Sequence, residues 1–130
     1  MIVLDASAVL EWLLQTRVGA RVEARVFSEA ATLHAPHLVD IEVAQVLRRY
    51  VKKGLITGSR GDQALEDLVD LSLTRYPHDM LLSRIWALRD NLTAYDAAYV
   101  ALAEALDAPL VTCDTKIAAA PGHRARVEVF

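Results

Sequence analysis

Residues 93–114 read TAYDAAYVALAEALDAPLVTCD and predict a helix followed directly by a strand. From Thr93 to about Leu106 the segment is apolar on nearly every side until Glu104, which is typical of a buried helix. The short run Leu110–Thr112 has the continuous apolar character of a strand covered on both faces. A buried helix that leads into a buried strand is a building unit of α/β folds with a parallel sheet.

The rest of the chain alternates in the same way between short apolar runs and amphipathic helices. The predicted strands are Ile2–Leu4, 32–34, 72–76, Leu110–Thr112 and 127–130. The predicted helices begin after Ser7 as an N-cap and, beyond a break at Gly19, cover 20–30, 38–53, 59–71, 78–89, 93–106 and 115–120. Because connections are short and there is no repeat or linker, we expect one α/β domain over residues 1–130. Its predicted architecture is a three-layer sandwich around a mostly parallel sheet.

Composition narrows the class of protein. The chain has 130 residues, of which 54% are hydrophobic, so it is long enough to bury a core and too apolar for disorder. Its net charge of −3 gives no overall basic field for nucleic acid, and its one cysteine, Cys113, suits a reducing compartment. No targeting leader and no apolar run of membrane-spanning length is visible. We therefore expect a cytoplasmic protein without membrane segments.

Four acidic residues follow strand-like runs or lie near the start of helices; they are Asp5, Glu42, Asp96 and Asp114. The carboxyl ends of parallel strands meet at one edge of a sheet, where such folds bind ligands, so we expect these side chains to gather there. At about 4 Å and an effective dielectric near 20, two carboxylates repel by roughly 4 kcal/mol. A divalent cation, Mg²⁺ or Mn²⁺, would relieve this repulsion, because hard oxygen ligands select such ions.

Each acid also has a purely structural interpretation. Asp5 could cap the first helix, although Ser7 is available for that role, and Asp114 could cap the short helix that follows it. Asp96 stands in a Thr-x-x-Asp arrangement that resembles a capping box. Glu42 falls at the border of the apolar face of its helix and could be an ordinary surface glutamate. The sequence alone leaves these alternatives open.

The sequence contains few motifs for other kinds of functional site. The chain has no glycine-rich phosphate loop and no zinc-type spacing of Cys and His, and its four histidines are scattered. Local groups of basic residues could bind the phosphates of a nucleic acid. One group lies late in the helix predicted at 38–53 and the other near the C-terminus; they are Arg48, Arg49, Lys52 and Lys53, and Arg124 and Arg126. The first group could equally be a solvated helix face.

With these residues in place, the chain resembles the PIN-domain ribonucleases, specifically the VapC toxins of type II toxin–antitoxin pairs. The motifs that carry the resemblance are IVLDASAVLEWLL (2–14), PHLVDIEVAQVLRR (36–49) and NLTAYDAAYVALAEALDAPLVTCD (91–114). The resemblance implies a PIN-like fold and endonucleolytic cleavage of RNA that depends on Mg²⁺ or Mn²⁺. It implies Asp5 and Asp96 as principal metal ligands, supported by Glu42 and Asp114. The second motif departs slightly, because Gln45 stands where relatives often carry Asn.

The same resemblance implies supporting residues and partners. Ser7 and Thr112 would steady the acids from neighbouring strand ends. A VapB antitoxin would cover the site, with the helices at 38–53 and 59–71 forming its groove, and the chain would form a homodimer. The RNA substrate would be a tRNA or rRNA, cut by in-line attack of water to leave a 5′-phosphate and a 3′-hydroxyl.

Three rival classes fit the sequence less well. A haloacid dehalogenase-type phosphatase needs a second Asp where Ser7 stands, and Lys116 follows Asp114 too closely to serve as its lysine. A receiver domain needs paired acids after its first strand. A non-catalytic PIN-like module that only engages a protein partner or RNA is the main alternative. Such a module would still bind after Asp5→Ala and would never cut RNA.

Overall fold

The centre of the molecule is a five-stranded sheet in which every neighbouring pair of strands is parallel. A computed structural model describes residues 1–130. The strands are β1 (Ile2–Leu4), β2 (Leu33–Pro36), β3 (Leu73–Tyr76), β4 (Leu110–Thr112) and β5 (Val127–Val129). Across the sheet they lie in the order β3-β2-β1-β4-β5. The predicted α/β fold is confirmed, and the sheet is wholly rather than mostly parallel.

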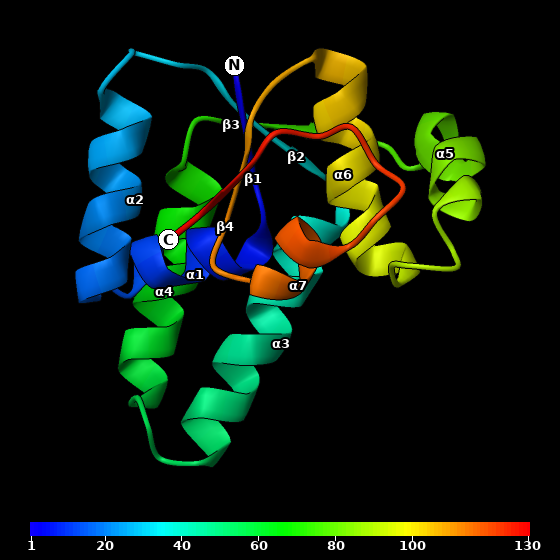
Figure 1. The fold of residues 1–130 in the computed structure, drawn as a ribbon. Helices are drawn as coiled ribbons and strands as arrows, with labels where there is room; N and C mark the ends of the chain where they lie inside the picture. The colour runs from blue at the N-terminus through cyan, green and yellow to red at the C-terminus, as the bar shows by residue number, and fades with distance from the viewer.

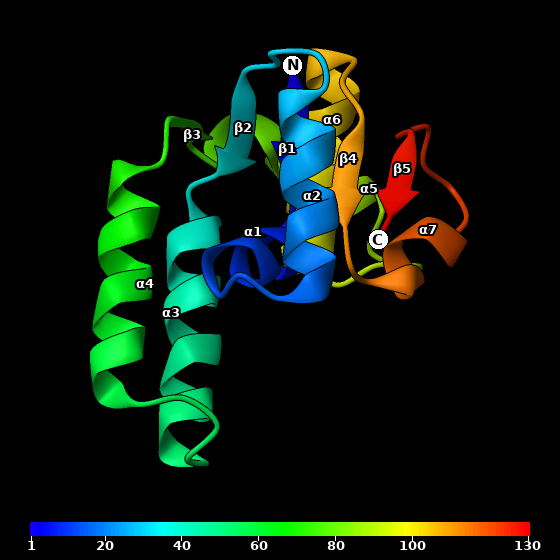
Figure 2. The same ribbon diagram turned by 90° about the vertical axis from the view of Figure 1, so that its left-hand side faces the viewer.

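Helices cover both faces of this sheet (Figure 1). They are α1 (Ala6–Leu13), α2 (Arg17–Phe27), α3 (Leu38–Lys52), α4 (Gly58–Asp70), the 3₁₀ helix η1 (Asp79–Leu81), α5 (Leu82–Ala87), α6 (Ala94–Leu106) and α7 (Thr115–Ala119). α1 and α2 pack together on one side, whereas α6, with α5 outside it, lies on the other. Figure 2 shows α3 and α4 as a pair that projects beyond the ends of the strands. None of the helices combines the length and the apolar character that crossing a bilayer requires.

The strand order places a crevice at the carboxyl ends of β1 and β4. From β1 the chain proceeds to β2 on one side, while β4 pairs with the other side of β1, with Val3 opposite Leu110. The direction of strand addition therefore reverses between β1 and β4, which is where open α/β sheets bind ligands. Asp5 directly follows β1, and Asp114 lies shortly after β4. Two of the four predicted acids therefore flank the reversal point.

α6 is the central helix of the core. Every residue from Ala97 to Ala103 is buried, which confirms the prediction of a buried helix from its apolar sequence. The helix begins at Thr93, whose Oγ1 accepts a hydrogen bond from the backbone N–H of Asp96 at 3.2 Å. It ends at Asp107, which adopts the left-handed conformation with φ of 48°. Because β1, β2 and β4 all pack against α6, its first turn is held in place beside the strand ends.

The first helix begins earlier than predicted, and Ser7 is not its N-cap. α1 starts at Ala6, so Asp5 occupies the N-cap position, yet its side chain makes no capping hydrogen bond. Ser7 lies inside α1, and its Oγ donates to the Asp5 carboxylate at 2.8 Å. The prediction was wrong because a serine shortly after a strand has the same sequence signature in either role. We had expected that the Asp5 side chain would be free of a capping role, and this is confirmed, because it makes no capping hydrogen bond.

Two other helix boundaries differ from prediction. Gly19 does not break the chain but lies inside α2, because Thr16 starts that helix by accepting the Gly19 backbone N–H at Oγ1, 3.0 Å away. The break comes earlier, at Gln15, where φ is 55°. Residues 78–89 form only η1 and the six-residue α5, and Trp86 is 68% exposed. The apolar residues of that segment therefore do not form one core-facing stripe.

Candidate active site

All four predicted acids line one open cleft, about 640 Å³ in volume, at the carboxyl ends of β1 and β4. Asp5 follows β1, Glu42 lies on α3, Asp96 lies in the first turn of α6, and Asp114 immediately precedes α7. The cleft is therefore lined by residues from α1, α3, α6 and the segment between β4 and α7. The parallel fold thus brings together four carboxylates from distant parts of the sequence.

Asp5 is buried and held by two hydroxyl groups. Its Oδ2 accepts hydrogen bonds from Ser7 Oγ at 2.8 Å and from Thr112 Oγ1 at 2.5 Å. Both hydroxyl oxygens in turn accept backbone N–H groups, those of Cys113 and Asp114, each at 2.9 Å. No side chain donates to the other oxygen, Oδ1, and that oxygen is not sealed from solvent. The network therefore orients the carboxylate and leaves one oxygen available to a ligand in the cleft.

Glu42 belongs to a stripe along α3 that faces the cleft. The other members follow at helical spacings of three, four and seven residues; they are Gln45, Val46 and Arg49. Glu42 is half-buried, and its Oε1 accepts a hydrogen bond from the phenol of Tyr99 at 2.6 Å. Glu42 is therefore not an ordinary surface glutamate. Burial and the adjacent Glu42 carboxylate hold the pKa of Tyr99 far above its usual value, so the phenol remains a donor.

The structural interpretation as a helix cap applies to Asp114 but only in part to Asp96. The backbone N–H of Thr93 donates no hydrogen bond to the Asp96 carboxylate, so only half of a capping box is formed, and Asp96 lines the cleft. Asp114 does cap α7, because its Oδ1 accepts the backbone N–H of Lys116 at 2.9 Å. It also lines the cleft. Capping and a place in the site are therefore compatible for Asp114.

No cation neutralises these four carboxylates. None of them takes part in any ion pair of the structure. Burial is the largest cause that raises the pKa of Asp5, and the charge of Asp114 adds to it, whereas the Thr112 and Ser7 hydroxyls oppose it. Burial also raises the pKa values of Glu42 and Asp96, with repulsion from Asp5 adding to both. The cleft therefore carries concentrated negative charge that is only partly compensated.

Comparison with known proteins shows the family to which the chain belongs. Residues 2–122 match the model of the PIN domain family. Over 117 residues the chain is 48% identical to ribonuclease VapC9 of Mycobacterium tuberculosis, which covers 90% of this chain and 88% of that protein. The chain belongs to the PIN-domain family, among the VapC ribonucleases. The family that the three sequence motifs indicated is confirmed.

Two solved structures share the PIN fold of this chain. The crystal structure of PAE2754 from Pyrobaculum aerophilum has a TM-score of 0.74 at 22% identity and covers 98% of this chain and 83% of that one. The structure of VapBC2 from Rickettsia felis, bound to a DNA fragment from its promoter, has a TM-score of 0.70 at 15% identity. It covers 99% of this chain and 98% of that chain. At these identities the likeness concerns the fold.

The cleft of this VapC-family chain suits a divalent cation that keeps part of its water shell. No three His, Cys, Asp or Glu side chains anywhere in the chain are grouped closely enough to hold a metal ion by themselves. Mg²⁺ commonly binds through only one or two carboxylates and retains several waters. The carboxylate oxygens left free at Asp5 and Asp96 are donors of that kind. The donor set therefore fits Mg²⁺ or Mn²⁺ rather than a fully protein-ligated ion.

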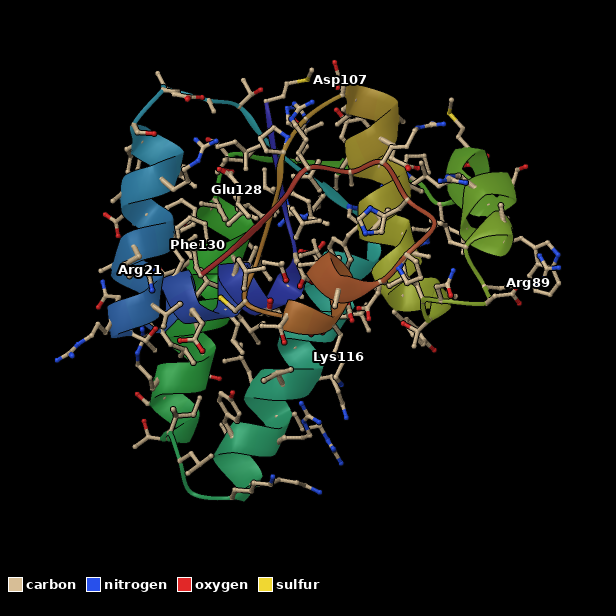
Figure 3. The ribbon with its side chains drawn as sticks, viewed as in Figure 1. Arg21, Arg89, Asp107, Lys116, Glu128 and Phe130 are labelled. Atoms are coloured by element: carbon tan, nitrogen blue, oxygen red, sulfur yellow. The ribbon has the colours of Figure 1, made fainter.

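The two predicted basic groups differ in their relation to the cleft. Arg49 lines it, and the other members of its group are exposed and free of ion pairs; they are Arg48, Lys52 and Lys53. Arg126 instead pairs with Asp107 at 2.9 Å, at the other end of α6, about 16 Å along the helix from Asp96. Figure 3 labels Asp107 at that far end of α6. Neither Arg124 nor Arg126 lines the cleft, and their binding of phosphates stays a prediction.

Sequence reasoning did not assign four polar residues that line or support the cleft; they are Glu11, Tyr50, Tyr95 and Tyr99. Glu11 on α1 lines the cleft as a fifth carboxylate, but it stands in an amphipathic helix where an acid has no distinguishing signal. Tyr99 stands three residues after Asp96 in an apolar run, which predicts a core residue. It is indeed buried, with no exposed surface. The helical spacing between Asp96 and Tyr99 puts them on one face, and this was the signal available.

Replacing Asp5 by asparagine is expected to stabilise the metal-free protein at neutral pH. The folded state raises the pKa of Asp5 above its ordinary value of 3.8. The protonated carboxyl therefore stabilises the folded state below that pH, and this contribution is lost as the pH rises through the folded-state pKa. Asparagine retains an acceptor for Ser7 and Thr112 while removing the charge. We expect calorimetry in EDTA to show a Tm higher by roughly 3–6 °C at about pH 7.5, for a relief on the order of 1 kcal/mol.

The gain in Tm should shrink as the pH is lowered to about 4, where the wild-type carboxyl also becomes protonated. If the Asp5→Asn variant is less stable than wild type at neutral pH, the claim that the Asp5 charge destabilises the metal-free protein is wrong. Added Mg²⁺ should raise the Tm of wild type at neutral pH and change that of the variant much less.

Proposed function

We propose that this VapC-family chain is the toxin of a type II toxin–antitoxin pair and a Mg²⁺- or Mn²⁺-dependent endoribonuclease. One observation carries the proposal: four carboxylates without a cationic partner line a cleft at the reversal point of the sheet. The 48% identity to a protein named as a ribonuclease supports RNA as the substrate. Its proposed place of action is the cytoplasm, and its proposed targets are tRNA or rRNA.

Each acid has a proposed role that its surroundings support. Asp5 and Asp96 would be the principal metal ligands, since both line the cleft and neither forms an ion pair. Glu42 would act with the oxygen that Tyr99 does not hold, directly or through water. Asp114 would position water with the oxygen not used for capping. When bound, the cation would activate water and neutralise charge that develops on the phosphodiester.

The RNA strand is proposed to leave the cleft along α3. Arg49 lies seven residues after Glu42 on the same face, which is about 10 Å along the helix axis. Lys52 and Lys53 continue in that direction, towards the tip of the α3–α4 projection in Figure 2. Cations spaced along one exposed helix can hold successive phosphates of a single strand. This local track would supply the affinity that the acidic net charge does not.

Arg49→Ala should weaken RNA binding in a salt-dependent way. For single strands, each lost phosphate contact reduces the slope of log K against log salt concentration by about 0.7. Arg126→Ala is the matched control, because it removes the same charge from an arginine that pairs with Asp107 away from the cleft. Fluorescence anisotropy with a labelled RNA, in Ca²⁺ to prevent cleavage, would give both slopes. Equal slopes for the two variants would rule out a specific track along α3.

The proposed protein partners are a VapB-type antitoxin and a second copy of the chain. Membership of the VapC family supports the antitoxin. Leu65 and Val69 of α4 are 38% and 76% exposed beside a hollow that the Asp40–Arg75 ion pair borders. An amphipathic antitoxin segment could bury this apolar surface. The homodimer is proposed on the family resemblance alone.

Incubation of purified, antitoxin-free protein with total cellular RNA is the experiment that tests the proposed activity. Reactions with Mg²⁺, with Mn²⁺ and with EDTA would be followed by sequencing of the RNA ends. We expect discrete cuts that require metal and leave a 5′-phosphate and a 3′-hydroxyl. RNA that stays intact with every metal, while the folded protein still binds it, would instead establish the non-catalytic binding module.

A further inference from the structure

The phenol of Tyr99 is the one hydrogen-bonding group that joins α6 to α3. Tyr99 is completely buried, and its hydroxyl donates to Glu42 Oε1 at 2.6 Å. No other hydrogen bond of the structure connects these two helices. α3 packs instead against α1, α4 and β2. The position of the Glu42 carboxylate relative to α6 therefore depends on this contact.

Asp96 lines the cleft, whereas the buried phenol of Tyr99 reaches it only through its hydrogen bond to Glu42. Asp96 and Tyr99 are three residues apart, so the carboxylate and the phenol project from neighbouring positions on one side of the helix. The charges of Asp5 and Asp96 act against the ionised Glu42 side chain, which is half-buried and forms no ion pair. Without a donor, repulsion would favour rotation of Glu42 out of the cleft. The hydrogen bond from Tyr99 opposes that rotation.

We propose that Tyr99 is a positioning residue, which holds the Glu42 carboxylate in the cleft beside Asp96 so that a divalent cation binds there. The inference rests on the proposed metal-dependent function, and it concerns how this chain builds the site. Because Oε1 is held by the phenol, Glu42 offers Oε2 to the cation or its water shell.

Tyr99→Phe is expected to weaken Mn²⁺ binding about 10-fold, in the range observed when an outer hydrogen bond to a metal-ligating group is removed. Titration calorimetry of the apo-protein with Mn²⁺ measures this without any RNA. The Mn²⁺ concentration for half-maximal cleavage should rise by a similar factor, with a smaller change in the rate at saturating metal. A loss of rate at saturating Mn²⁺, with unchanged Mn²⁺ affinity, would overturn the proposal.

Tyr76→Phe is the matched control. It removes the same atom from a phenol that contacts a buried side chain, His34 Nδ1, at 2.7 Å and does not line the cleft. Its cost in stability should resemble that of Tyr99→Phe, while its Mn²⁺ affinity should equal that of wild type. An equal loss of Mn²⁺ affinity in both variants would show a general effect of destabilisation and would refute a specific role for Tyr99.

Glu42→Gln tests whether Tyr99 affects Mn²⁺ binding through Glu42 or through the stability of the fold. It leaves Tyr99 and its packing intact, and it should weaken Mn²⁺ binding at least as much as Tyr99→Phe. Adding Tyr99→Phe to Glu42→Gln should then cause little further loss. A Glu42→Gln variant with wild-type Mn²⁺ affinity would contradict the proposal even if Tyr99→Phe does not fold. If wild type binds Mn²⁺ but never cuts RNA, the proposed nuclease activity fails while the role of Tyr99 is still decided by these titrations.

Discussion

Replacing Asp96 by asparagine should lower metal-dependent RNA cleavage by at least about 100-fold, the scale of losing one electrostatic group that acts on the transition state. The substitution keeps the size of the side chain and the backbone N–H bond to Thr93 that starts α6. It removes a carboxylate that lines the cleft and forms no ion pair, and whose charge is opposed by Asp5 and Asp114. The fold should therefore persist while the proposed metal site is lost. Initial rates with a labelled RNA at several Mn²⁺ concentrations would measure the effect.

The control for Asp96→Asn is Asp90→Asn. Asp90 is an exposed acid near the same helix that neither lines the cleft nor forms an ion pair. Its replacement makes the same change in net charge and should leave the cleavage rate within about twofold of wild type, as a surface change remote from the site. A folded Asp96→Asn variant that cuts RNA at the wild-type rate would exclude Asp96 as a principal ligand.

Gly19→Ala should destabilise the protein by about 3 kcal/mol or more, which lowers Tm by roughly 10 °C or more for a domain of this size. A Cβ at this position would lie 2.1 Å from the Glu11 carbonyl oxygen and 2.9 Å from the Trp12 backbone nitrogen. Both are backbone atoms of α1, so no flexible side chain can move aside. α1 and α2 would have to separate, and α1 carries Ser7 and Glu11 into the cleft. Thermal unfolding followed by circular dichroism would measure the loss.

Gly58→Ala provides the comparison for this close approach. Gly58 is the first residue of α4, and an added Cβ meets no atom within 4 Å. Alanine favours helix over glycine by up to about 1 kcal/mol, so this variant should be as stable as wild type or slightly more so. If Gly19→Ala unfolds at the same temperature as Gly58→Ala, the contact between α1 and α2 is not as tight as described.

The acids could be placed from the sequence because strand ends are easy to locate in a parallel fold. Asp5 and Asp114 follow short apolar runs, and such runs in neighbouring parallel strands end at the same edge. Asp96 was recognisable because a charge in the first turn of an apolar helix needs a partner or a ligand. Glu42 was less certain, since its position on the border of a helix face is compatible with either cleft or solvent. The contact with Tyr99 decides it.

The misassigned features share a cause, which is that the deciding contact is distant in sequence. Ser7 reads as a helix cap, but its bonds go to Asp5 and to the backbone after β4. Gly19 reads as a helix breaker, yet it is the point where α2 touches the backbone of α1. The local sequence around such a residue does not distinguish its local role from a contact with a distant part of the chain.

The central claim, that the four-carboxylate cleft binds the catalytic cation, is tested most directly by diffraction from crystals of the wild-type protein soaked in Mn²⁺. The anomalous signal of manganese locates the ion without reference to activity. We predict an anomalous peak inside the cleft, with Asp5 and Asp96 nearest to it, and no such peak in Asp96→Asn crystals. Crystals of protein proven to cut RNA with Mn²⁺ that show no peak in the cleft, or one that persists unchanged in Asp96→Asn, would contradict the account.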